Sequence, residues 1–429
     1  MENKVRELQQ NLYRAAKMNP ERCFHSLYDK VYRSDVLWEA WKCVKENKGA
    51  PGNDGETIQD IIEQGEITYL RELQKELEEK RYRARSIRRV YIPKGDGRLR
   101  PLGIPRVRCR IVQAALKIVL EPILEAHFHE VSFGYRPHRS AKDASKRIYK
   151  YMNFGCNWVI RVDLKSYFDT IPHERLLTLV EKYTCDRNIL KLIKGWLQAK
   201  VVDRKEVFQP ERGSPQGSVV SPLLSNLYLH QFDEEWHRRG NHYRWRYDAK
   251  VTRYCDDILI QASKKNMQIW KEAKDILTGI GLEVNEEKTQ FVHARDGFDY
   301  LGFHFARGYS KRRRKEVTYI VPTQKSRKRA WQKVRCYTDK RKYHNLPIEW
   351  MVAKLNPVLL GWTQYYRHTN SSRVFQMLQS YTNKRIQKAL RYRRKKKGVG
   401  RYRELPNHIL YQRYGLVCIG MGRIEYCSS

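Results

Sequence analysis

The stretch RYCDDILI, residues 253–260, places two adjacent carboxylates, Asp256 and Asp257, directly before an apolar, β-branched run. Like charges repel, and each carboxylate loses hydration when it is buried. A solvated hairpin turn is the commoner explanation, because aspartate satisfies backbone groups locally. The alternative is a divalent-metal site, because cations such as Mg²⁺ select carboxylate oxygens and remove the repulsion. That interpretation requires a third carboxylate from elsewhere in the chain.

The segment WVIRVDLKSYFDTIPH supplies a candidate for the third carboxylate. Residues 158–164 predict a buried strand, and Asp163 lies at its end, before a turn into a helix. If this strand and the hairpin of Asp256 and Asp257 are neighbours in one sheet, three carboxylates meet at one edge. Such a group can hold two Mg²⁺ ions about 3.5–4 Å apart, one activating an attacking hydroxyl and one stabilising the leaving pyrophosphate. The pattern therefore predicts nucleotidyl transfer.

The charge of the chain indicates a polyanionic partner. Among 429 residues there are 85 lysines and arginines against 47 aspartates and glutamates, a net charge of +38. Residues 306–429 hold 31 of the basic and 5 of the acidic residues. A membrane surface is a competing polyanion, but the sequence has no apolar run of about 18 residues and no signal peptide. The 28 tyrosines favour nucleic acid, because aromatic rings stack on bases.

Nine cysteines are scattered through the chain without a C-x-x-C pair. The spacing argues against a zinc ribbon, and an odd number without a secretion signal is typical of reduced thiols in a cytosol. We expect most of them to be small core residues.

Clusters of Gly, Pro, Asn and Asp divide the chain into expected elements. Residues 1 to about 45 predict polar helices, and residues 108–128 predict a core helix. A Gly/Pro-rich loop precedes an apolar helix in residues 212–236, where Gly213 and Gly217 would let the backbone approach a ligand closely. Residues 281–305 predict two strands joined by a basic turn, and from residue 306 the pattern becomes helical and very basic.

The runs RRVYIP and RLRPLGIP, joined by KGDG, predict a β-hairpin. Basic residues follow this ribbon: Arg88, Arg89, Lys94, Arg98 and Arg100. An ordinary solvated face would explain them, and so would a clamp for phosphate groups.

Seven segments, taken in order, resemble the fingers and palm motifs of reverse transcriptases of the bacterial group II intron type. They are RRVYIPKGDGRLRPLGIP, SFGYRPHRSAKDA, RVDLKSYFDTIPH, GSPQGSVVSPLLSNLYLHQFD, RYCDDILI, NEEKTQFV and YLGFHF. LNPVLLGWTQYYR then resembles the maturase, or thumb, domain of that family. The resemblance runs from about residue 47 to about residue 395, and the ordered series leaves little room for the solvated-turn explanation.

The resemblance implies an α+β, right-hand polymerase fold, with fingers and palm made of antiparallel sheet and helices and followed by an α-helical thumb or maturase domain. It divides the chain into a helical N-terminal extension (residues 1–60), fingers and palm (61–305), thumb or maturase domain (306–395) and a basic C-terminal tail (396–429).

By position, the resemblance makes three carboxylates the catalytic ligands of two Mg²⁺ ions, with Mn²⁺ as a substitute: Asp163, Asp256 and Asp257. Residues that would contact the incoming triphosphate are Arg88, Lys94 and Arg100. Phe168 falls where the family places the aromatic ring that excludes a ribose 2′-hydroxyl. The nucleotide and template pocket would be lined by Pro215, Gln216 and Gly217. Lys288 is a candidate general acid for pyrophosphate or a contact to nucleic acid, and a solvated lysine is an equal alternative.

Two positions depart from the family pattern. Ser218 stands where the family usually has a second glycine, and Cys255 stands where it usually has alanine. Both replacements are small, so we expect activity to be kept, with fidelity, processivity or redox sensitivity open to change. The chain ends at GRIEYCSS without the metal-ligand spacing of the endonuclease that many relatives carry, so we expect no endonuclease.

The resemblance implies an RNA-directed DNA polymerase that extends a DNA or RNA primer with dNTPs on an RNA template, and a maturase that binds structured intron RNA. Target DNA is a further expected partner, a membrane is not, and the expected location is the bacterial cytoplasm near the nucleoid. Three alternatives stay open: an RNA-dependent RNA polymerase, a splicing-only RNA-binding maturase, and a host-adopted reverse transcriptase in repair or phage defence. All three carboxylates are present, which disfavours a splicing-only relic.

Overall fold

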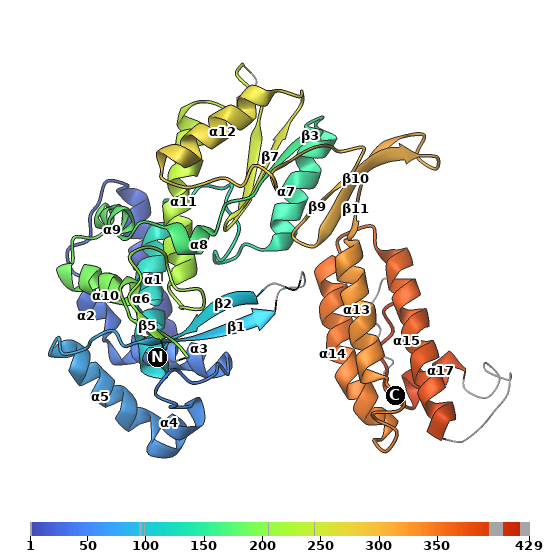
Figure 1. Cartoon of the computed structure of the whole chain (residues 1–429), viewed down its shortest axis with the longest axis horizontal. Helices are drawn as coiled ribbons and strands as arrows, with labels where there is room; N and C mark the ends of the chain where they lie inside the picture. The colour runs from blue at the N-terminus through green and yellow to red at the C-terminus, as the bar shows by residue number, and fades with distance from the viewer. Residues whose placement is uncertain are drawn as a thin grey trace. The chain divides into compact units, whose positions relative to one another are not determined.

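The computed structural model describes residues 2–93, 97, 99–204, 206–243, 245–393 and 406–420 (Figure 1). The chain forms two compact units, each made of two chain segments. The first unit comprises Met1–Ser140 and Ile160–Phe291, and the second comprises Ala141–Val159 and Val292–Ser429. Lys94, Arg98 and the rest of the predicted KGDG turn except Gly97 lie outside the described residues.

Helices at the N-terminus of the first unit pack around one long apolar helix, α6 (Val107–Glu125), which is buried along most of its length as its composition predicts. Helices α1 (Glu2–Met18), α2 (Tyr28–Val31) and α3 (Ser34–Glu46) contact α6, whereas α5 (Glu66–Glu78) packs on α3 and α4 (Ile58–Gln64) packs on α5. Thr57 and Asp60 form a capping box at the start of α4, which fixes where that helix begins. The expected helical N-terminal region and core helix are therefore confirmed.

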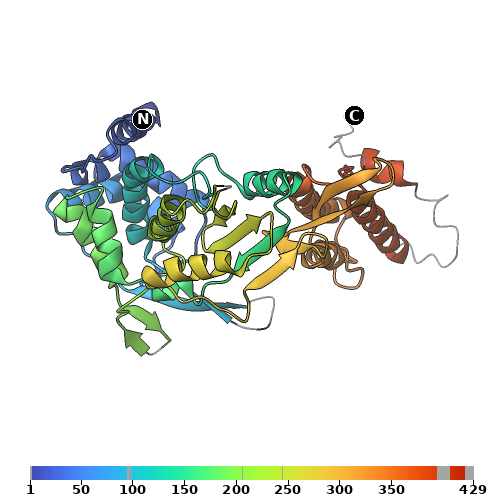
Figure 2. The same cartoon turned by 90° about the horizontal axis from the view of Figure 1, so that it is seen from above.

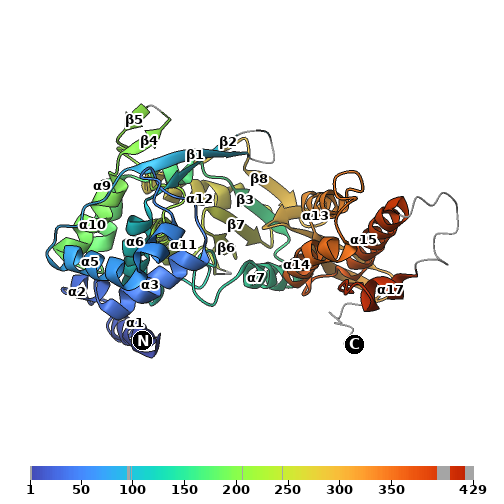
Figure 3. The same ribbon diagram turned by 90° about the horizontal axis from the view of Figure 1, so that it is seen from below.

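The first sheet has the order β2-β1-β4-β5. Its strands are β1 (Ile87–Pro93), β2 (Leu99–Ile104), β4 (Val201–Asp203) and β5 (Glu206–Phe208). β1 and β2 pair antiparallel, with Ile92 opposite Arg100 and Arg88 opposite Ile104, so the predicted hairpin is confirmed. The short β4–β5 hairpin lies beside the first residues of β1 (Figure 3).

The second sheet has the order β6-β7-β3-β8 and brings together strands that are far apart in sequence. They are β3 (Trp158–Val162), β6 (Lys250–Tyr254), β7 (Asp257–Ala262) and β8 (Gln290–His293). Figure 2 shows α12 alongside β6 and β7. The helices that follow β3 and β7 are α8 (Tyr167–Thr170), α9 (His173–Glu181), α10 (Arg187–Leu197), α11 (Ser221–Arg238) and α12 (Met267–Gly279).

The second unit contains α7 (Ala141–Asn153) and a three-stranded sheet of order β11-β10-β9. The strands are β9 (Phe298–Tyr300), β10 (Phe303–Ser310) and β11 (Lys315–Pro322). The helices α13 (Gln324–Tyr337), α14 (Ile348–Tyr366), α15 (Ser372–Arg393) and α17 (Asn407–Gln412) follow. Leu355, Leu359 and Leu410 lie in the core of these helices.

Three details of the sequence interpretation are corrected. Residues 306–322, which were expected to be helical, belong to the antiparallel β10–β11 hairpin, because the alternation of inward residues that starts at Phe303 and Phe305 continues as strand while the basic run SKRRRK spans the turn. The predicted strand of residues 158–164 ends at Val162. In residues 282–284 the expected strand is reduced to a single bridge, from Val284 to Leu164.

Two further expectations differ from the structure. Only Cys109, Cys156 and Cys255 are buried among the eight cysteines that are described, so most of these cysteines are not core residues. Residues 406–420 of the predicted C-terminal tail contain α17 and bury Leu416 and Ile419 in the second core. The other tail residues, 396–405 and 421–429, lie outside the described residues. No helix within the described ranges has the length and apolar run needed to cross a bilayer.

Candidate active site

The β6–β7 hairpin carries the two adjacent aspartates. Tyr254 pairs with Asp257, so Cys255 and Asp256 form the two-residue turn. Cys255 has φ +56°, the left-handed region that two-residue hairpin turns require. Its side chain is buried, with Sγ 3.9 Å from the Ser225 hydroxyl, whereas Asp256 is open to solvent on its outer side. The turn therefore buries the small residue and presents the carboxylate.

Asp163 lies next to this hairpin because β3 is the neighbour of β7 in the sheet. Its backbone carbonyl accepts a hydrogen bond from the Asn285 amide at 2.8 Å, which ties the end of β3 to the segment before β8. Arg161 of β3 reaches Asp257 across the strands at 3.7 Å, and Lys288 reaches Asp163 at 3.7 Å. Three carboxylates thus gather at one sheet edge with two cations among them.

The electrostatics of this edge favour a cation. Although Asp256 is exposed on its outer side, the protein around its carboxyl group removes water from it and so raises its pKa; the charge of Asp163 raises this pKa further, while Arg100 opposes the shift. Burial also raises the pKa of Asp257, Arg161 opposes that shift, and both neighbouring aspartates add to it. The charge of Asp163 thus adds to the raised pKa values of Asp256 and Asp257, and the three carboxylates form a donor set suited to a hard divalent ion.

Two of the three carboxylates form long ion pairs with basic side chains of the protein. Within the described ranges, no three His, Cys, Asp or Glu side chains are placed so that they could hold a metal ion. Arg161 and Lys288 are the nearest counter-charges, at ion-pair distances of 3.7 Å and with half-exposed side chains. The carboxylate oxygens of Asp163, Asp256 and Asp257 are of the type that binds Mg²⁺. The two long ion pairs are weak, so these side chains could rotate toward a bound Mg²⁺ ion.

Arg100 links the fingers hairpin to the glycine-rich loop. Its Nε donates to Gln216 Oε1 at 2.8 Å, and Gln216 Nε2 donates in turn to Asp169 Oδ2 at 3.5 Å. The effect of Arg100 on the pKa of Asp256 places this cation near the hairpin turn. Arg88 lies in β1 on the same side of the pleat as Ile92, the partner of Arg100. Lys94, the remaining expected triphosphate contact, is outside the described residues.

The loop of residues 212–220 needs both of its glycines. Gly213 has φ +91°, and a Cβ there would lie 2.9 Å from backbone atoms of Phe168 and Asp169. Gly217 has φ +110°, and a Cβ there would lie 2.4 Å from the carbonyl oxygen of Gly103. The loop therefore packs backbone against backbone on α8 and β2, so both glycines are required by contacts within the protein, and the expected approach to a ligand stays a prediction.

The other expected pocket residues lie in the same region. Phe168 is half-buried in α8, and its carbonyl accepts from the Ser214 amide at 2.6 Å. Pro215 and Gln216 line a cavity of about 330 Å³, together with Arg89, Asp169 and Arg212. Gly217 does not line this cavity. Ser218, which replaces the usual glycine, is buried and donates from its hydroxyl to Gln113 Oε1 at 3.0 Å.

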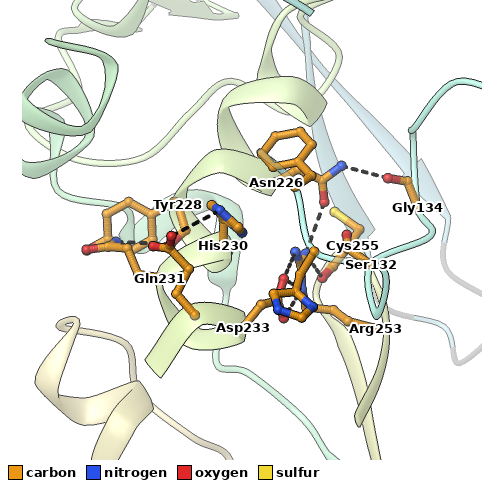
Figure 4. Close-up of polar contacts among 12 residues, drawn as sticks. Ser132, Gly134, Asn226, Tyr228, His230, Gln231, Asp233, Arg253 and Cys255 are labelled. Atoms are coloured by element: carbon orange, nitrogen blue, oxygen red, sulfur yellow. Dashed lines mark hydrogen bonds and ion pairs between the residues drawn. The ribbon is translucent and has the colours of Figure 1, made fainter. Parts of the chain in front are cut away.

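A buried charge network behind the hairpin was not predicted from the sequence. Arg253 is fully buried in β6, and its Nε lies 3.0 Å from both carboxylate oxygens of Asp233 in α11. Its Nη1 donates to Asn226 Oδ1 at 3.0 Å and to the Cys255 carbonyl at 3.1 Å (Figure 4). Asn226 also donates to the Gly134 carbonyl at 2.6 Å.

This network holds the Cys255–Asp256 turn from behind. Burial alone would lower the pKa of Arg253, but the Asp233 carboxylate beside it raises that pKa above its usual value. The Arg253 backbone also pairs with the segment before Gly134, with bonds of 2.8 Å to Val131 and from Phe133. A Cβ on Gly134 would lie 2.5 Å from the Cys255 nitrogen, so only glycine lets the two segments meet. The aspartate turn is thus fixed by backbone contacts and by one buried ion pair.

Comparison with known proteins identifies the family. Residues 92–305 match the reverse transcriptase (RNA-dependent DNA polymerase) family, and residues 327–408 match the group II intron, maturase-specific domain. The chain is 32% identical to Protein YkfC of Escherichia coli over 359 residues, which cover 75% of this chain and 94% of that protein. It is 31% identical to the group II intron-encoded protein LtrA of Lactococcus lactis over 66% of this chain and 57% of LtrA.

The α+β fold expected from the sequence is confirmed: fingers and palm elements are followed by a helical domain. The two domain matches and the similarity to YkfC agree with the ordered motifs and with the carboxylate edge of the palm sheet. The chain belongs to the group II intron family of RNA-directed DNA polymerases, and it combines a reverse transcriptase with a maturase domain.

Proposed function

We propose that the chain extends a primer with dNTPs on an RNA template at the edge formed by Asp163, Asp256 and Asp257. The observation that carries this proposal is the meeting of three carboxylates, from two neighbouring strands, with Arg100 and Lys288 around them. When bound there, two Mg²⁺ ions, or Mn²⁺ in their place, would lower the pKa of the primer hydroxyl and stabilise the departing pyrophosphate.

The chain's own residues bind and orient the nucleotide. Three cations would neutralise the negative charge of the triphosphate: Arg88, Lys94 and Arg100. Arg88 and Arg100 lie on the same side of the β1–β2 hairpin. Lys288, which already contacts Asp163, would place an ammonium beside the pyrophosphate as it leaves. Phe168 would exclude a ribose 2′-hydroxyl, and Pro215, Gln216 and Gly217 would form the adjoining wall of the nucleotide and template pocket.

The maturase part would bind structured intron RNA and assist splicing. Lys328, Arg329 and Lys333 are exposed on α13, within the residues that match the maturase-specific domain. The net charge of +38 favours binding to structured intron RNA and to target DNA. With these partners, the protein would act in the bacterial cytoplasm near the nucleoid. The functional division at residue 306 is retained, since the reverse transcriptase match ends at residue 305.

Primer extension tests the site. With Mg²⁺, dNTPs and a primed RNA template, Asp256→Asn should lower extension by at least about 10³-fold, because it removes a charge on which transition-state stabilisation depends. Asp275→Asn, on the exposed face of α12, is the matched control and should extend at the normal rate. Normal extension by the Asp256→Asn protein would refute the assignment.

A further inference from the structure

Two cysteines and a histidine meet on the surface of the first unit. The proposed polymerase reaction does not use any of them. Cys23 and His25 lie between α1 and α2, and Cys185 lies between α9 and α10, about 160 positions away in sequence. None of the three belongs to a motif that the polymerase function absorbs. Cys185 and His25 are exposed, and Cys23 is half-buried.

The backbone holds these two segments side by side. Phe24 and Thr184 form a parallel bridge, with the Phe24 amide donating to the Tyr183 carbonyl at 2.9 Å and the Cys185 amide donating to the Phe24 carbonyl at 3.2 Å. Phe24 and Thr184 are buried. Since alternate residues of paired extended segments face opposite sides, Cys23, His25 and Cys185 share the outer face.

Asp186 strengthens the same junction. Its Oδ2 accepts from the amides of Leu27 and Tyr28 at 2.9 and 2.8 Å, while its Oδ1 caps α10 through the Asn188 amide. The segment that carries Cys23 and His25 is therefore fixed to the segment that carries Cys185 on both sides of the bridge.

The reactive atoms are in contact. Cys185 Sγ lies 2.8 Å from His25 Nδ1, close enough for the thiol proton to pass to the imidazole. The Cys23 thiol interacts with both the thiol and the backbone N–H of Cys185, and its Sγ lies 3.6 Å from the Glu181 carbonyl oxygen. Burial raises the pKa of Cys23, and the Cys185 thiol raises it further. An exposed thiol with a base beside it and a second thiol within reach is the arrangement of an attacking and a resolving cysteine.

We propose that Cys23 and Cys185 form a reversible disulfide when the protein meets a low-molecular-weight disulfide, with Cys185 as the attacking thiol and His25 as its base. Cys185 gives its proton to His25, and its sulfur attacks one sulfur of the small disulfide, releasing one small thiolate and forming a mixed disulfide. The Cys23 thiolate then attacks Cys185 sulfur and releases the second small thiolate. Two protein thiols are oxidised, one small disulfide is reduced, and the two thiol protons end on the released thiolates.

The bond would fasten the N-terminal helices to the α9–α10 connection. It closes a loop of about 160 residues, and a cross-link over such a loop chiefly restricts the unfolded chain. Oxidation should therefore raise the unfolding temperature of the first unit by roughly 5 °C, and a reductant should reverse the rise.

The test exposes the full-length, reduced protein to oxidised glutathione at pH 7.5, blocks free thiols and maps the peptides by mass spectrometry. We expect one main linkage, between Cys23 and Cys185. Cys23→Ser should stop at the mixed disulfide, with one glutathione on Cys185. His25→Gln should form the linkage at least about tenfold more slowly. Cys336→Ser, which removes an exposed cysteine of the second unit, is the matched control and should behave as the unchanged protein.

The mapping experiment uses the unchanged protein, so a variant that fails to fold does not decide it. The proposal is overturned if Cys23 and Cys185 stay reduced while Cys43 or Cys336 takes up glutathione. It is also overturned if glutathione is spread equally over the exposed cysteines, or if His25→Gln reacts at the unchanged rate.

Discussion

At the scale of single residues, the raised pKa values of Asp256 and Asp257 predict how stability depends on pH. A carboxyl group whose pKa is raised by folding stabilises the folded state below the ordinary aspartate pKa of about 3.9, and this contribution is lost as pH rises through the folded-state pKa. At neutral pH both ionised groups therefore oppose folding.

Asp257→Asn should accordingly unfold at a higher temperature than the unchanged protein at pH 7.5 in EDTA, because the amide carries no charge to desolvate. The difference should shrink as pH falls toward 4, and added Mg²⁺ should stabilise the unchanged protein more than the variant. Thermal unfolding across this pH range measures both effects. An Asp257→Asn protein that is less stable at pH 7.5 and equally stabilised by Mg²⁺ would contradict the electrostatic account.

Single residues of the site also differ in how well the local sequence predicts them. Asp163, Asp256 and Asp257 were predictable because each borders a strand-like apolar run, and the ordered motifs then assigned them a role. Arg253 was not predictable as a buried residue, because an arginine in a short strand normally indicates a solvated face. Its partner Asp233 lies on another element, and only tertiary packing joins the two.

At the scale of elements, the ion pair between α11 and β6 should fix the position of the turn that carries Asp256. Arg253→Met leaves the Asp233 carboxylate buried without a partner, so we expect a loss of roughly 3–5 kcal/mol in unfolding free energy. The double variant Arg253→Met/Asp233→Leu should recover much of that stability. Primer extension should stay low, because the Cys255 carbonyl still lacks the guanidinium that holds it.

Urea unfolding and primer extension on the same samples provide this comparison. Arg238→Met, which removes an exposed ion pair with Glu235 on the same helix, is the control and should change neither quantity appreciably. Recovery of full activity along with stability in the double variant would show that Arg253 acts on stability alone.

Elements also differ in how well their sequences predict them. The β1–β2 hairpin was predictable because two strand-like runs flank a glycine-rich turn. The β10–β11 hairpin was missed because its turn is a run of arginines and lysines, and the basic helix α13 follows directly after β11. The helical prediction from residue 306 relied on the basic composition and overlooked the strand-like alternation of apolar residues in β10 and β11.

At the scale of the whole molecule, charge predicts how RNA binding responds to salt. Each phosphate contact releases counterions, so the affinity for structured RNA should fall steeply with salt concentration. The triple variant Lys328→Gln/Arg329→Gln/Lys333→Gln should reduce the logarithmic salt slope by about 2–3, because these exposed α13 residues are proposed phosphate contacts. Filter binding at several salt concentrations measures the slope.

The control for this prediction changes the same number of charges in the first unit. Lys264→Gln/Lys265→Gln/Lys271→Gln should leave the slope for the intron RNA close to that of the unchanged protein. Equal reductions in both variants would mean that RNA binding follows total charge and not the α13 surface.

Helix α7 is synthesised long before the strands with which it packs. Its inward residues, including Ala144, Ile148 and Met152, pack with β10 and β11, which follow it by well over a hundred residues. At 5–20 residues per second, synthesis would leave this amphipathic helix without its partners for on the order of 10–30 s. During that interval the neighbouring palm segments can already begin to fold. Completion of the second unit is therefore tied to the last third of translation.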